Sequence, residues 1–215
     1  RDQPRSRGLG DVYKRQGTHI GNALEVKDAI DVLAGRTQGD LLEISLLLGS
    51  HMLVLAEKAK TLPEARAMLE NALSSGAGLR KLAEMIAAQG GDSRVVEDLS
   101  LLPQAAVKRV MRAETAGYLS AMDTTALGMA AQRMGAGRAK KSDMLDYSVG
   151  YVLHVRLGDE VTEDTPLATL YARNEAEAEE AEKAIRKALT IARKKPQAPK
   201  LWDAVVTAEG IIYNR

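Results

Sequence analysis

Three histidines, His19, His51 and His154, are the side chains best suited to proton transfer or metal binding near neutral pH. No two of them have the spacing of a zinc motif such as His-Glu-x-x-His, and the sequence has no cysteine. His51 lies within the most apolar stretch, which favours a core histidine over a catalytic base. His154 is on the opposite side of a predicted strand from the valines, so we expect it to face solvent. The histidines predict no catalytic centre by themselves.

The segment GAGRAKK, residues 135–141, is the best candidate for anion binding. Its glycines would let backbone N–H groups approach a ligand, and Arg138, Lys140 and Lys141 add positive charge. The alternative is the end of a helix followed by a solvated basic loop. No Walker loop or Gly-x-Ser-x-Gly elbow occurs, so neither a P-loop enzyme nor a serine hydrolase is indicated.

The segment RLGDEVTEDTPLATLYA, residues 156–172, has the strand–turn–strand pattern of a biotinyl or lipoyl carrier. A carrier presents a lysine at a hairpin tip, beside small or sulfur-containing residues. Lys140 and Lys141 lack that setting. A non-enzymatic binding or carrier-like module is therefore the second hypothesis for function.

Composition limits the possible classes of protein. The 215 residues are 45% hydrophobic, which is enough for a core, and the absence of Phe makes that core aliphatic. A net charge of +1 provides no large field of one sign to attract nucleic acid. No apolar run reaches the length of a membrane span, and the lack of cysteine suits a reducing cytoplasm.

The first half of the chain has the apolar periodicity of helices, which we expect over 22–34, 41–59, 62–73 and 79–89. Asp40 with Glu43, and Thr61 with Glu64, have the spacing of capping boxes. The second helix is apolar on almost all sides, so other elements must cover it.

The second half changes to the period of strands, expected over 106–113, 117–122, 147–157, 166–172 and 201–206. A tight Glu114-Thr115 turn predicts that the first two form a hairpin. Asp123 and Asn174 are expected to cap helices over 124–134 and 175–195. The fold class is therefore α+β, with a helical part over 17–103 and an α+β domain over 104–215.

Several stretches in order along the chain resemble pyrimidine-nucleoside phosphorylases and thymidine phosphorylases. They are GNALEVKDAI, LGSHMLVLAEKA, AAQGGD, MDTTALGMAAQRMGAGRAKKSD and DYSVGYVLHVRLGDEV. The resemblance runs from about Gly17 to Val206. It implies that 17–103 is the helical remainder of the catalytic domain. It also implies that 104–215 is the family's C-terminal domain, with a small, largely antiparallel sheet of barrel-sandwich or hammerhead type.

The resemblance also implies a function, since such enzymes use phosphate to convert thymidine or uridine to the free base and a pentose 1-phosphate. They are homodimers, and their chemistry needs no organic cofactor. The family's phosphate-binding loop and base-binding residues precede the Gly21-Asn22 helix. The resemblance therefore implies no catalytic or substrate-binding residue in this chain, and little or no activity for it as a C-terminal fragment.

Residues 1–16 are basic and lack a periodic apolar face. Their end, DVYKRQ, resembles a translated cloning adapter, and the alternative is a disordered basic arm. On either interpretation, we expect native sequence from Gly17.

The resemblance implies one ligand site in part. Some family members bind a structural potassium ion through two main-chain carbonyls before Gly-Asn and an acidic side chain on the next helix. The matching positions are Gln16, His19 and Asp28. The family usually has Leu, Ala and Glu there, and its other ligands come from the upstream loop. We therefore expect the ion to be held poorly by this chain alone.

Overall fold

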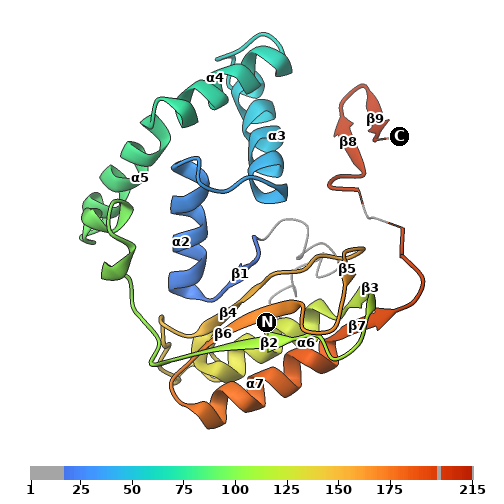
Figure 1. The fold of residues 1–215 in the computed structure, drawn as a ribbon. Helices are drawn as coiled ribbons and strands as arrows, with labels where there is room; N and C mark the ends of the chain where they lie inside the picture. Colours follow the sequence, from blue (N-terminus) through green and yellow to red (C-terminus); the bar gives the residue numbers. More distant parts are fainter. Residues whose placement is uncertain (1–16, 198–199, 215) are drawn as a thin grey trace.

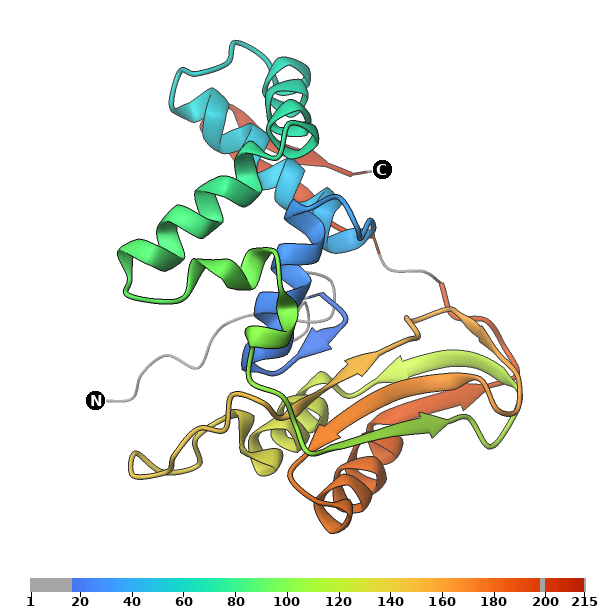
Figure 2. The same ribbon diagram turned by 60° about the vertical axis from the view of Figure 1, so that its left-hand side comes forward.

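The computed structural model describes residues 17–197 and 200–214. The predicted lead-in, residues 1–16, lies outside the described residues. A helical part forms one layer and a sheet-containing part the other (Figures 1 and 2). Among the described residues, no helix is both long enough and apolar enough to cross a bilayer.

The helical part follows the predicted order closely. It consists of α2 (Asn22–Leu33), α3 (Asp40–Leu55), α4 (Leu62–Ser74), α5 (Ala77–Ala88) and the 3₁₀ turns η2 (Ser93–Val96) and η3 (Leu99–Leu101). The Thr61 cap is confirmed, because its hydroxyl accepts the Glu64 N–H at 3.3 Å. The Asp40 cap is wrong. Gly39 takes the N-cap position, and the Asp40 carboxylate instead pairs with Arg156 at 2.7 Å.

The sheet-containing part is built from short antiparallel strands and two helices, which confirms the α+β class. Its elements are β2 (Val107–Arg112), β3 (Gly117–Met122), α6 (Thr124–Ala131), the π-helical turn η4 (Gln132–Ala136), β4 (Gly150–Leu153), β5 (Glu160–Val161), β6 (Pro166–Ala172), α7 (Glu175–Ala188) and β7 (Leu189–Ala192). One sheet has the order β1-β4-β6-β2, where β1 is His19–Ile20, and a second has the order β5-β3-β7. No closed barrel forms among the described strands.

The predicted hairpin of β2 and β3 is wrong, since these strands belong to different sheets. After β2 the chain stays beside 164–165, where the Ala113 N–H donates to the Thr165 carbonyl at 2.8 Å. Gly117 then starts β3 with a φ of +154°, and a Cβ there would lie 2.7 Å from the Ala192 carbonyl oxygen. The close pairing of β3 with β7 therefore outweighs the local turn signal.

The predicted helix over 175–195 ends early. Leu189 is extended, and the chain continues as β7 along β3. The apolar side of α7 ends at Ala188, and the branched residues Thr190 and Ile191 suit the strand. The predicted final strand is found as β8 (Ala204–Thr207), which pairs with β9 (Gly210–Tyr213).

The main core lies between the sheets and helices α6 and α7 (Figure 1). The Tyr151 hydroxyl donates to the Leu127 carbonyl at 2.8 Å, so the largest buried side chain links β4 to α6. The predicted strand over 147–157 is shorter than expected, and all four residues of β4 are buried. This central strand is therefore covered by the elements around it, with α6 on one side and α2 near the other.

Helix α3 has the apolar surface expected from its sequence, and part of it is uncovered. Leu48, Met52 and Leu55 share one face of the helix and are 54%, 67% and 84% exposed. Ile44, one turn before Leu48, and Leu46, on the opposite side of the helix, are both buried. Contiguous apolar surface of this kind favours association.

We expect the chain to bind a hydrophobic dye and to self-associate through the α3 face. Replacing Met52 and Leu55 together by Lys should reduce both, measured by dye fluorescence and sedimentation velocity. The free energy of unfolding should change by less than about 0.5 kcal/mol per site, because these side chains are exposed. Met144→Lys is the matched control, since Met144 is 90% exposed but lies outside α3. A monomeric wild-type chain that binds no dye would contradict this prediction.

Candidate functional site

The junction of β1 and α2 contains the two described residues of the predicted potassium site. β1 pairs with β4, with His19 opposite Val152. Gly21, at a φ of +139°, turns the chain into α2, and the Ala23 N–H donates to the Tyr147 carbonyl at 3.0 Å. The start of α2 is therefore held against the sheet.

The structure brings His19 and Asp28 together. Asp28 is only 5% exposed, and its Oδ2 atom lies 3.4 Å from His19 Nδ1. The same ring nitrogen is 3.2 Å from the Thr18 hydroxyl. A Cβ on Gly17 would lie 1.7 Å from Asp28 Oδ2, so the carboxylate rests against the Gly17 backbone. The third predicted ligand, Gln16, lies outside the described residues.

The pairing of β1 with β4 leaves the His19 carbonyl oxygen available to bind a hard cation. The Leu153 N–H donates to the Thr18 carbonyl at 2.8 Å, which makes that pair the hydrogen-bonded one. In an antiparallel ladder the next residue points its polar groups away from the partner strand. The His19 carbonyl is thus free of β4, and carbonyl and carboxylate oxygens are the ligands that hard cations prefer. In the part of the chain that the structure describes, no group of three His, Asp or Glu residues is placed to hold a metal ion.

The other two histidines, His51 and His154, lie outside the junction of β1 and α2. His154 is exposed, as predicted, and its Nε2 atom lies 2.7 Å from the Thr169 hydroxyl. Partial burial, with the nearby charges of His19 and Lys108, lowers the pKa of His154. The imidazole is therefore neutral at neutral pH. His51 was expected in the core but is only half-buried, because α3 is incompletely covered.

The basic segment 135–141 is a helix end followed by a loop. Gly135 has a φ of +105° within η4. The N–H groups of Ala139 and Lys140 both donate to Asp143 Oδ2, at 3.0 and 2.8 Å. These donors, which an anion would need, are therefore already bound to a carboxylate. Lys140 and Lys141 lie in the loop between η4 and β4 and not at a hairpin tip.

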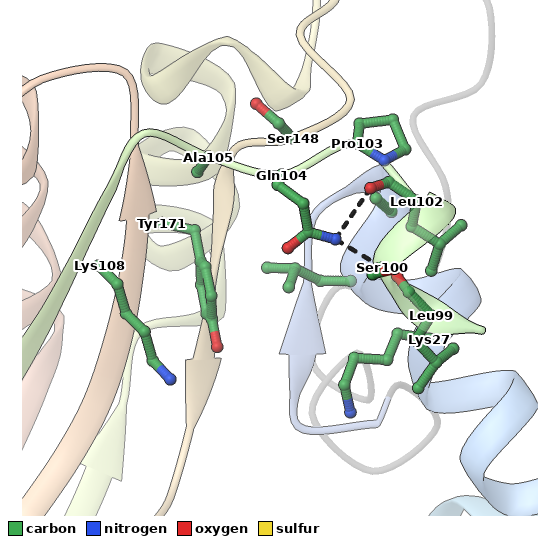
Figure 3. A pocket seen from close by; sticks show the side chains of 12 residues that line it. Lys27, Leu99, Ser100, Leu102, Pro103, Gln104, Ala105, Lys108, Ser148 and Tyr171 are labelled. Carbon is green, nitrogen blue, oxygen red and sulfur yellow. Dashed lines mark hydrogen bonds between the residues drawn. The ribbon is translucent and has the colours of Figure 1, made fainter. Parts of the chain in front are cut away.

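Sequence reasoning missed a pocket of about 320 Å³ between the helical part and the sheet (Figure 3). Its walls come from α2, from η3 and the following link, and from strands β2 and β6. Lys27, Gln104, Lys108 and Tyr171 are among its lining residues. They are far apart in sequence and form no motif, so no local pattern in the sequence predicts this pocket.

Comparison with known proteins identifies the C-terminal half. The family described as "Pyrimidine nucleoside phosphorylase C-terminal domain" matches residues 118–192. The chain contains a pyrimidine-nucleoside phosphorylase C-terminal domain. This confirms the resemblance seen in the sequence.

Similarity to individual proteins extends beyond that domain and covers most of the chain. The chain is 48% identical over 167 residues to the pyrimidine-nucleoside phosphorylase of Bacillus subtilis (strain 168), covering 78% of this chain and 39% of that protein. The enzyme of the same name from Geobacillus stearothermophilus is 47% identical over the same shares. That of Staphylococcus aureus (strain USA300) is 41% identical over 184 residues, or 86% and 42% of the two chains. The chain thus spans about two fifths of the length of these relatives.

The close contact of the Asp28 carboxylate with Gly17 should make any side chain at position 17 destabilising. Gly17→Ala places a methyl group against the carboxylate, and we expect it to lower the free energy of unfolding by about 1–3 kcal/mol. Chemical denaturation followed by circular dichroism measures the change.

Gly128→Ala is the matched control for this prediction. Gly128 lies in α6, and a Cβ added there would meet no other atom within 4 Å. The same substitution should therefore stabilise the protein by about 0.5–1 kcal/mol, because Ala favours a helix interior over Gly. Equal effects at the two sites would show that the contact with Asp28 is unimportant.

Proposed function

We propose that this chain is part of a pyrimidine-nucleoside phosphorylase that acts on thymidine or uridine. A phosphate oxygen forms a bond to C1′ of the pentose while the bond from C1′ to the base nitrogen breaks. The products are a pentose 1-phosphate and the free base, which takes up a proton. The observation that carries this proposal is the 48% identity, over 78% of the chain, to a protein of that name.

We further propose that the chain alone has little or no activity. The segment most suited to phosphate, residues 135–141, has two of its backbone donors bound to Asp143. The exposed face of α3 is consistent with a surface that further protein covers in a complete enzyme. We expect that enzyme to be a cytoplasmic homodimer. The carrier alternative has no comparable support, because Lys140 and Lys141 lie outside any hairpin.

The activity of the purified chain tests this proposal. We expect no release of thymine or uracil from thymidine or uridine with phosphate, measured by liquid chromatography. The Bacillus subtilis relative, assayed alongside, should release base and so validates the conditions. Turnover by this chain in the usual enzyme range of about 1–1000 per second would contradict the proposed inactivity.

We propose that the His19 carbonyl and the Asp28 carboxylate are part of a potassium site in the complete enzyme. Both are oxygen ligands, and the buried Asp28 carboxylate lies beside β1. The imidazole of His19 also contacts this carboxylate and competes for it.

Since two oxygens make only part of a cage, K⁺ should raise the melting temperature of this chain no more than Na⁺ at equal ionic strength. Differential scanning calorimetry measures both, because an ion that binds only the folded chain stabilises it. An increase specific to K⁺ that disappears in Asp28→Asn would show instead that the chain alone completes the site.

A further inference from the structure

The pocket between the helical part and the sheet is lined by an aromatic ring, by lysines and by leucines. Tyr171, on β6, presents one ring face toward Gln104 and the pocket (Figure 3). The Nζ atom of Lys108 lies 5.8 Å from the ring centroid. Leu24, Leu99 and Leu102 line other parts of the wall. Such a wall suits a flat ring, because an aromatic face favours stacking.

The charged side chains that line the pocket are both positive. Lys27 and Lys108 line it, and none of its described lining residues is Asp or Glu. Lys27 donates to Asp31 at 2.5 Å, but an ammonium group has three donors and retains the capacity for further hydrogen bonds. Lys108 is exposed to solvent and also lies near the Tyr171 ring. The ligand that fits these groups is an anion.

Gln104 adds a hydrogen-bond acceptor of fixed orientation. Its Nε2 atom donates to the Leu99 carbonyl at 3.3 Å and the Leu102 carbonyl at 2.8 Å. Because carbonyls only accept, these contacts identify the nitrogen, and Oε1 is left as the acceptor. Among the described residues, no donor reaches Oε1. A ligand with a ring N–H would satisfy it.

We propose that this pocket binds a nucleoside monophosphate through stacking on Tyr171, an N–H donated to Gln104 Oε1, and a phosphate near Lys108 and Lys27. A flat ring, a ring N–H and an anionic group occur together in this class of ligand. The pocket volume of about 320 Å³ lies within the range of small-molecule sites. The proposal concerns binding to this chain and does not rest on the proposed phosphorolysis.

The test is calorimetric titration of the full chain with uridine 5′-monophosphate, with uridine and inorganic phosphate as comparison ligands. We expect saturable binding of the monophosphate and much weaker binding of the other two. Lys108→Gln and Tyr171→Leu should each raise the dissociation constant about tenfold, by losing a charge-assisted contact and a stacking contact.

Lys81→Gln and Tyr213→Leu are matched controls, because both residues lie outside the pocket and Tyr213 is 66% exposed. They should leave the dissociation constant unchanged. Thermal unfolding of each variant verifies that it is folded. Absence of saturable binding at millimolar monophosphate, equal affinity for phosphate alone, or unchanged affinity in folded Lys108→Gln would each overturn the proposal.

Discussion

The close approach of β1 to β4 is the constraint on which the candidate ion site and the pocket both depend. A Cβ on Gly150 would lie 2.1 Å from the Ile20 carbonyl oxygen, and one on Gly21 would lie 2.5 Å from that of Val149. Both glycines also have positive φ, which other residues rarely adopt. Since β1 leads directly into α2, this contact places Lys27 and Asp28 on the sheet side of the helical part.

The sheet that receives α2 is itself held from the opposite side. Helices α6 and α7 cover it there with an aliphatic core, and the Tyr151 hydroxyl bonds to α6. On the face toward the helical part the sheet carries polar and charged side chains, including Lys108, Thr169 and Tyr171. One face of this sheet thus packs in the aliphatic core, and the other faces the helical part.

Local signals in the sequence predicted most elements well. Thr61, Asp123 and Asn174 cap helices as expected, because the side-chain acceptor and the free N–H groups are within three residues of each other. Predictions of a helix cap and of an anion site failed where a residue from elsewhere bound the same polar group. Arg156 takes the Asp40 carboxylate, and Asp143 takes the N–H groups of the basic loop.

The sequence by itself determined the α+β class, the family resemblance and the positions of His19 and Asp28 in it. Those features depend on periodicity, caps and residue order, which act over a few residues. Only the tertiary structure decided that β2 and β3 belong to different sheets, that α7 ends at Ala188, and that a pocket forms beside Tyr171. These outcomes depend on burial and hydrogen bonds between segments far apart in the chain, and no local pattern specifies which segments meet.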